Sequence, residues 1–118
     1  MSGKAIPEIG VQELARKLAS GEPFVLLDVR EAWELEHALI EDARTRVAPM
    51  SRLAQLGKAA LPQELEDRSA LVLVLCHHGV RSATATAWLR EQGWSNVFSV
   101  RGGIAEYARS VDRTVGRY

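Results

Sequence analysis

The residues of this 118-residue chain that are best suited to chemistry follow a single apolar run. Residues 71–75 are all leucine or valine, and they lead directly into Cys76, the only cysteine of the chain. The thiolate is the nucleophilic form of cysteine, and unpaired backbone N–H groups at the positive end of a helix dipole favour it. Cys76 is therefore a candidate nucleophile, although a lone cysteine after an apolar run can equally be a small core residue.

The residues after Cys76 favour the nucleophile. Gly79 permits a tight loop and a close approach of the backbone to a ligand, and Arg81 and Ser82 add a permanent cation and a hydroxyl. Successive N–H groups that curl around one sulfur would form a nest for an anion. The pattern therefore predicts an activated nucleophile that acts on an anionic substrate.

The paired histidines His77 and His78 also suggest a metal site, which the spacing argues against. Adjacent side chains rarely converge on one ion, and the remaining histidine, His37, is distant in the sequence. We therefore predict no metal and no cofactor, and interpret both histidines as loop residues that contribute mainly through their backbone amides.

The elements around Cys76 are expected to place it at one edge of a sheet. A short apolar run is typical of a strand buried on both faces, and residues 81–92 have the pattern of a following helix. In open α/β sheets, ligands bind outside the carboxyl ends of the strands. A second strand leads into Asp28 and Arg30 at the same expected edge.

Strands and helices are predicted to alternate along the chain. This order indicates an α/β fold with a mainly parallel central sheet of about five strands and helices on both faces. We expect residues 1–118 to form one domain. The predicted strands are 24–27, 44–48, 71–75 and 96–100, and the predicted helical segments are 11–18, 31–37, 50–58, 63–67, 81–92 and 104–111.

The composition argues against several classes of partner. Lysine plus arginine and aspartate plus glutamate both total 15, so we expect neither nucleic acid nor a membrane as a partner. No apolar run approaches the length of a membrane span, and no export signal is recognisable. One cysteine cannot form an intramolecular disulfide. We therefore expect a cytoplasmic, monomeric protein.

Three segments of the chain resemble the signature segments of the rhodanese family of sulfurtransferases. They are Asp28-Val29-Arg30-Glu31 followed by Trp33-Glu34, then the loop from Cys76 to Ser82, and finally Val100-Arg101-Gly102-Gly103-Ile104. The resemblance extends from about Ile9 to Arg117-Tyr118. It implies a rhodanese-like domain and a thiosulfate sulfurtransferase activity without a cofactor.

The resemblance also implies roles for the loop residues. Cys76 would take a sulfane sulfur from a donor such as thiosulfate and hold it as a persulfide. It would then pass the sulfur to cyanide, a thiol or a protein acceptor. Arg81 would contact the anionic end of the donor. The cradle around the sulfur would consist of the backbone of His77, His78, Gly79, Val80, Arg81 and Ser82.

Other functions remain open at this point. Related phosphatases place five residues between cysteine and arginine, whereas four separate Cys76 from Arg81, so sulfur transfer is favoured over phosphatase or arsenate reductase activity. A module that relays sulfur to a protein partner, or only docks on it, is the main alternative.

Several residues near these segments need a separate interpretation. Residues 39–43 depart from the His-Ile-x-Gly-Ala run that relatives commonly carry, which puts the shape of the pocket wall in doubt. For Asp28 and Arg30 we favour structural roles, as a helix cap and its ion-pair partner. Gly102 and Gly103 are expected to form a tight turn beside the cysteine loop. By default, large aromatic side chains are core residues, which applies to Trp33, Trp88 and Trp94.

Overall fold

A single parallel sheet organises the chain. The computed structural model describes residues 5–118 and has the strand order β1-β5-β4-β2-β3, with every neighbouring pair parallel. This confirms the predicted α/β class and the mainly parallel five-stranded sheet. The strands are β1 (Glu8–Ile9), β2 (Val25–Asp28), β3 (Thr45–Val47), β4 (Val72–Leu75) and β5 (Val97–Val100).

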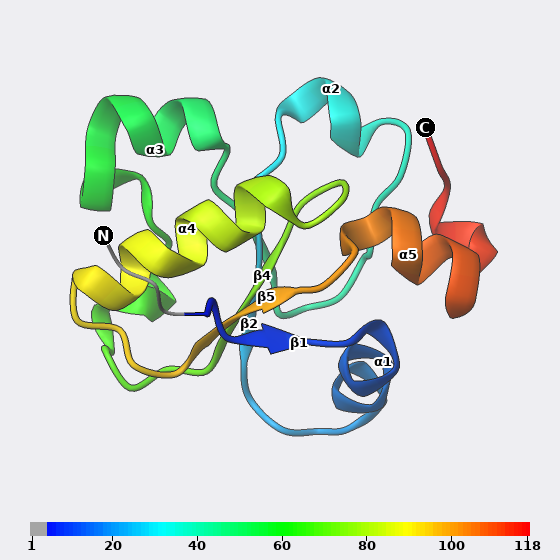
Figure 1. Cartoon of the computed structure of the whole chain (residues 1–118), viewed down its shortest axis with the longest axis horizontal. Coiled ribbons are helices and arrows are strands. Elements are labelled where there is room, and N and C mark those ends of the chain that lie inside the picture. The colour runs from blue at the N-terminus through cyan, green and yellow to red at the C-terminus, as the bar shows by residue number, and fades with distance from the viewer. Residues whose placement is uncertain (1–4) are drawn as a thin grey trace.

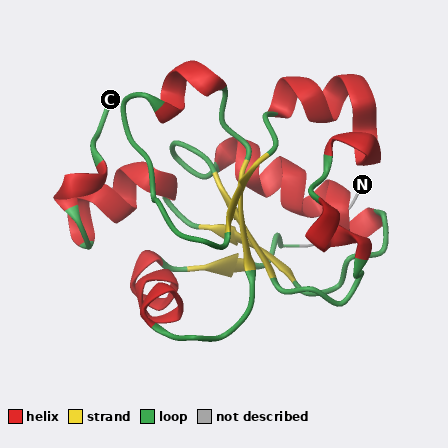
Figure 2. Ribbon diagram, turned by 180° about the vertical axis from the view of Figure 1, so that it is seen from behind, coloured by secondary structure: helices red, strands yellow, loops and turns green. Residues whose placement is uncertain are grey.

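Helices cover both faces of this sheet, as predicted (Figures 1 and 2). Leucine and valine alternate along β4, so Val72 and Val74 enter one apolar core while Leu73 and Leu75 enter the other. The first core contains side chains of α3 (Met50–Leu56) and α4 (Val80–Glu91). The second contains side chains of α1 (Val11–Ala19) and α5 (Gly103–Ser110). The short helix α2 (Ala32–Leu35) follows β2.

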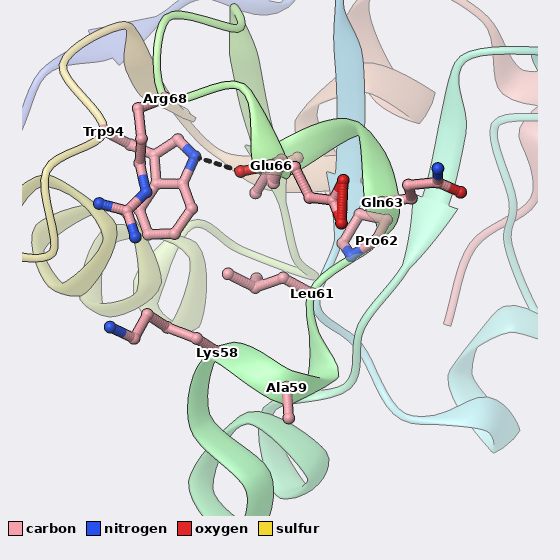
Figure 3. Close-up of a pocket in the computed structure, with 9 residues that line it drawn as sticks. Lys58, Ala59, Leu61, Pro62, Gln63, Glu66, Arg68 and Trp94 are labelled. Carbon is pink, nitrogen blue, oxygen red and sulfur yellow. Dashed lines mark hydrogen bonds between the residues drawn. The ribbon is translucent and has the colours of Figure 1, made fainter.

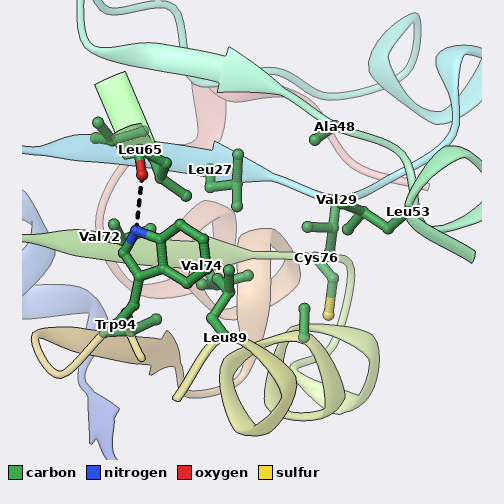
Figure 4. Packing of buried hydrophobic residues seen from close by; sticks show 13 residues of the cluster. Leu27, Val29, Ala48, Leu53, Leu65, Val72, Val74, Cys76, Leu89 and Trp94 are labelled. Carbon is green, nitrogen blue, oxygen red and sulfur yellow. Dashed lines mark hydrogen bonds between the residues drawn. The ribbon is translucent and has the colours of Figure 1, made fainter. Parts of the chain in front are cut away.

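Cys76 lies at one end of the first core, beside Val29 and Leu53 (Figure 4). Trp94 lies at the other end of the core, next to Val72, and its indole N–H donates to the carbonyl oxygen of Leu65 at 2.9 Å. Parallel pairing with β2 and β5 holds β4 between these two neighbours. Cys76 follows directly after Leu75, the last residue of β4.

The structure refines several predicted boundaries. β1 has two residues, too few to give an apolar pattern, and was not predicted. The segment 63–67 is a 3₁₀ turn, Gln63–Glu66, that begins after Pro62. Two further 3₁₀ turns lie at Gly57–Ala60 and Arg113–Val115. Within residues 5–118, no helix is both long and apolar enough to cross a lipid bilayer.

Candidate active site

Cys76 lies at the carboxyl ends of the parallel strands. Leu75, the last residue of β4, pairs with Asp28, the last residue of β2, so both strands end at the same level. The Cys76 side chain is buried, and three loop residues connect it to α4. Gly79 directly precedes this helix with a φ of 101°, a left-handed conformation that L side chains rarely adopt. The sharp turn predicted at Gly79 is therefore confirmed.

The sulfur of Cys76 has two backbone N–H groups and one hydroxyl group as hydrogen-bond partners. The backbone N–H groups of Gly79 and Ser82 point at Sγ, with N···S distances of 3.0 and 3.3 Å. The hydroxyl of Ser82 lies 3.3 Å from the same sulfur. Two of the six predicted cradle amides thus contact Sγ. Both belong to the loop end and first turn of α4, where the helix dipole also favours negative charge.

The turn at Gly102 and Gly103 brings backbone N–H groups of α5 within hydrogen-bond distance of the cysteine loop. The N–H groups of Ile104 and Ala105 donate to the carbonyl oxygens of Cys76 and His77 at 2.9 and 3.0 Å. A Cβ atom on Gly103 would overlap both of these carbonyl groups. The prediction of a tight glycine turn beside the cysteine loop is confirmed, and the reason is the close approach of two backbones.

Arg81 is paired with a carboxylate that the sequence analysis did not assign to the site. Its Nη1 and Nη2 atoms donate to Oε2 and Oε1 of Glu34, on α2, at 2.6 and 2.7 Å. The hydrogen bonds from Arg81 lower the pKa of Glu34 to about 2, and Glu34 raises the pKa of Arg81. The Glu34 side chain is 4% exposed and that of Arg81 35% exposed, so the pair opens to solvent on the arginine side.

Asp28 and Arg30 form a second pair, which is closed to solvent. Nε and Nη2 of Arg30 donate to the two carboxylate oxygens of Asp28 at 2.9 and 2.7 Å, and both side chains are buried. Burial alone would lower the pKa of Arg30, but the hydrogen bonds and charge of Asp28 raise it. The ion pair predicted for Asp28 and Arg30 is thus confirmed. The predicted helix cap is wrong, because Glu31 is the N-cap of α2, and Oδ1 of Asp28 instead accepts from the backbone N–H of Arg30 at 3.1 Å.

Tyr118 connects the two pairs. Its hydroxyl accepts from Nη1 of Arg30 at 3.1 Å and donates to Oε1 of Glu34 at 2.8 Å. Burial is the main reason why the pKa of Tyr118 is raised. Asp28, Arg30, Tyr118, Glu34 and Arg81 therefore form one continuous hydrogen-bonded chain from the end of β2 to the cysteine loop.

The ring of Tyr118 also holds the loop directly. It stacks on the His77 ring with a centroid distance of 3.8 Å, and Nε2 of His77 donates to the main-chain oxygen of Tyr118 at 3.0 Å. Burial, followed by the charge of His78, lowers the pKa of His77, so the neutral ring is favoured. The His77 ring thus has contacts of its own, whereas the amides that contact Sγ are those of Gly79 and Ser82. This corrects our interpretation that His77 contributes mainly through its amide.

The three tryptophans differ in their surroundings. Trp94 is buried and Trp88 is half-buried against the first core. Trp33 is 59% exposed, and the edge of its ring faces Tyr118 at a centroid distance of 6.0 Å. The default expectation of a core position is therefore wrong for Trp33, which belongs to the rim that also holds Glu34.

The atypical segment 39–43 packs away from the sulfur. The N–H of Leu39 donates to the carbonyl oxygen of Val115 at 2.9 Å, and Ala38 forms an antiparallel bridge with Gly116. These hydrogen bonds hold in place Val115 and Gly116, which precede Tyr118 in the chain. The segment therefore affects the site through the C-terminal segment and not through a contact with Cys76.

A separate hollow lies at the opposite end of the sheet, beside Trp94 (Figure 3). The guanidinium of Arg68 stacks on the Trp94 ring at 3.9 Å from its centroid and donates to the carbonyl oxygen of Gln92 at 2.7 Å. Of the charged residues that line this hollow, which are Lys58, Glu66 and Arg68, Arg68 is thus engaged in packing the tryptophan. The chemistry-bearing residues gather at the other edge, around Cys76.

The fold and the loop together define an α/β protein with a cysteine held in a ring of amides at the edge of a parallel sheet. Residues 10–110 match the family model described as the Rhodanese-like domain, and the chain belongs to this family of sulfurtransferase-type enzymes. A protein named sulfurtransferase from Allochromatium vinosum is 33% identical over 104 residues, which cover 88% of this chain and 90% of that protein.

Two further relatives show how widely the domain is used. A crystal structure of a rhodanese-related protein from Thermoplasma volcanium has a TM-score of 0.71 and 30% identity, and the match covers 89% of this chain and 93% of that one. A tRNA uridine(34) hydroxylase of Xanthomonas campestris is 33% identical over 77% of this chain, which spans only 35% of that protein. Membership of the family therefore does not by itself define the substrates of this chain.

Proposed function

We propose that this protein transfers a sulfane sulfur from thiosulfate, or a similar donor, to cyanide or another thiophilic acceptor. The main support for the proposal is that Cys76 Sγ accepts hydrogen bonds from the backbone N–H groups of Gly79 and Ser82. Unpaired amides and the helix dipole favour an anionic sulfur at this place. The family supports the same class of reaction.

In the first half-reaction, the Cys76 thiolate attacks the outer sulfur of thiosulfate. A bond forms between Sγ and that sulfur, the S–S bond of thiosulfate breaks, and sulfite leaves with the electron pair. The product is a persulfide anion on Cys76. No proton has to be moved in this step, because the thiolate is the form of cysteine that attacks.

In the second half-reaction, the acceptor attacks the outer sulfur of the persulfide. With cyanide, a carbon–sulfur bond forms, the S–S bond breaks, and its electron pair returns to Cys76 as the thiolate. Thiocyanate leaves. The four residues between Cys76 and Arg81 close a narrower ring than a phosphoryl group would need, which favours sulfur as the transferred group.

The decisive experiment is mass spectrometry of the protein with and without thiosulfate. We expect a mass gain of one sulfur atom, which the Cys76→Ser variant does not show. Cyanide should remove the added sulfur and produce thiocyanate. If the wild-type protein gains no sulfur and forms no thiocyanate, the proposed reaction is wrong.

Arg81 is proposed to contact the anionic end of the donor. Two of its N–H groups point at Glu34, but the guanidinium has five N–H groups and is partly exposed. We therefore expect Arg81→Ala to weaken the use of thiosulfate about tenfold, and to slow the discharge of a preformed persulfide much less. Single-turnover rates of the two half-reactions measure this difference. Equal losses in both would argue against the role.

Delivery of sulfur to a protein acceptor is the second candidate function. Val80, the first residue of α4, is 74% exposed, and the exposed Trp33 neighbours Glu34 on the rim. Apolar side chains beside the nucleophile suit contact with a protein surface better than contact with a free anion. A single-turnover comparison of thiosulfate with a protein-bound persulfide as donor separates the two functions. Val80→Ser should reduce only the second reaction.

A further inference from the structure

Two buried hydroxyl groups continue from Cys76 into the sheet. Oγ of Ser82, in the first turn of α4, lies 3.3 Å from Cys76 Sγ. Oγ of Ser99, on β5, lies 2.8 Å from Oγ of Ser82. All three side chains are buried. Three different elements, the loop after β4, helix α4 and strand β5, thus contribute one atom each to a short polar chain inside the fold.

The chemistry of a hydroxyl fixes the direction of these hydrogen bonds when Cys76 is ionised. A thiolate can only accept, so the single hydrogen of the Ser82 hydroxyl must point at Sγ. Ser82 Oγ can then take part in the 2.8 Å bond only as the acceptor, and Ser99 must be the donor. When Cys76 carries a proton, the thiol can donate to Ser82 and both bonds can reverse. The two serines therefore respond to the charge on the sulfur.

A neighbouring threonine shows that a buried hydroxyl in this helix need not be paired. Thr86 lies one turn after Ser82 on α4 and is just as buried, yet its hydroxyl has no hydrogen-bond partner among residues 5–118. Ser99 has such a partner in Ser82, and that partner contacts the nucleophile. In a buried site, linked hydrogen bonds polarise and strengthen one another.

We propose that Ser99 is a positioning residue that directs the hydroxyl of Ser82 at Cys76 and so stabilises the thiolate relative to the persulfide. In the persulfide, the negative charge lies on the outer sulfur, and Sγ becomes a neutral, weaker acceptor. The serine chain then favours the step in which the S–S bond breaks and its electron pair returns to Sγ. The part of the inference that concerns the persulfide rests on the proposed function.

The test compares Ser99→Ala and Ser82→Ala with Thr86→Val, a matched control that removes the unpaired hydroxyl of the same helix. The first measurement is the fraction of Cys76 present as thiolate at one fixed pH, compared between the variants by ultraviolet absorbance. The charged and titratable groups of the site are unchanged in all three variants, namely Asp28, Arg30, Glu34, His77, His78, Arg81 and Tyr118. This measurement needs no sulfur transfer, so it stands even if the proposed function fails.

The second measurement is the single-turnover rate at which cyanide discharges a preformed persulfide. We expect Ser82→Ala to reduce this rate about tenfold and Ser99→Ala about fivefold, with a lower thiolate fraction in both. Thr86→Val should match the wild type in both measurements.

The double variant Ser82→Ala with Ser99→Ala decides whether Ser99 acts through Ser82. We expect it to behave like Ser82→Ala alone, because the second hydroxyl has nothing left to direct. If the two losses multiply, or if Ser99→Ala matches the wild type in thiolate fraction and discharge, the inference is wrong. If the wild type forms no persulfide at all while the thiolate fractions follow the expected order, only the proposed function fails.

Discussion

The two arginine–carboxylate pairs of this protein differ in their burial and in the elements that they connect. Asp28 and Arg30 are two residues apart, lie at the end of one strand and are closed to solvent. Glu34 and Arg81 are 47 residues apart, join α2 to the first turn of α4, and leave the arginine 35% exposed. The same ionic chemistry thus fixes the fold in one place and sets the charge beside the nucleophile in the other.

The largest expected effect comes from breaking the buried pair. Arg30→Met leaves the Asp28 carboxylate buried without its cation, and we expect the free energy of unfolding to fall by about 3–5 kcal/mol. Arg81→Met is the matched control. Glu34 keeps hydrogen bonds from Tyr118 and from the N–H of Glu31 in that variant, so we expect a loss of only about 1 kcal/mol. Urea unfolding measures both values, and equal losses would remove the distinction between the pairs.

The Glu34–Arg81 pair should make the free energy of unfolding depend on pH in the acidic range. The pKa of Glu34 is about 2 in the folded protein, against an ordinary value of 4.5. Its contribution is therefore complete above about pH 4.5 and is lost as the pH falls towards 2. After allowance for the solvent around Arg81, we expect this loss to be about 2 kcal/mol.

Glu34→Gln isolates that contribution, because the other carboxylates remain in the variant. The free energy of unfolding of Glu34→Gln should fall less than that of the wild type across the same acidic range. If both proteins lose stability in parallel, the Glu34–Arg81 pair contributes nothing that depends on the charge of Glu34.

The smallest expected effect comes from the hydroxyl that links the two pairs. Tyr118→Phe removes a donor from Glu34 and an acceptor from Arg30 but keeps the ring that stacks on His77. We expect a loss of about 1 kcal/mol in the free energy of unfolding. Tyr107→Phe is the control, since the hydroxyl of this buried tyrosine makes no hydrogen bond to another residue within 5–118. Thermal unfolding of both variants measures the difference, and equal melting temperatures would contradict the linking role of Tyr118.

The sequence pattern predicts the parts of this fold that depend on local regularity. The apolar run 71–75 contains the central strand β4, and the turn signals at Gly79 and at Gly102-Gly103 lie where two backbones approach each other. β1 could not be predicted because a two-residue strand has no periodicity. Its place in the sheet is set by pairing with β5, a contact between residues far apart in the chain.

The partners of the candidate site residues were harder to predict, for the same reason. Arg81 was expected to face a donor, and nothing near it in the sequence indicates Glu34 as its partner. Tyr118 has no neighbouring pattern that would connect it with His77, and Ser99 lies in an ordinary strand. Each of these contacts exists only because the sheet brings distant segments to one edge. Spacing within a loop is visible in the sequence, but a pairing between elements is not.

The position of Tyr118 has a consequence for the order in which the protein is completed. Its hydrogen bonds to His77, Glu34 and Arg30 span 41, 84 and 88 residues of sequence. Contacts of such long range form slowly, because a long loop must close before they are made. We therefore expect the hydrogen bonds that link Arg30, Glu34 and His77 through Tyr118 to be among the last contacts of the site to form during folding.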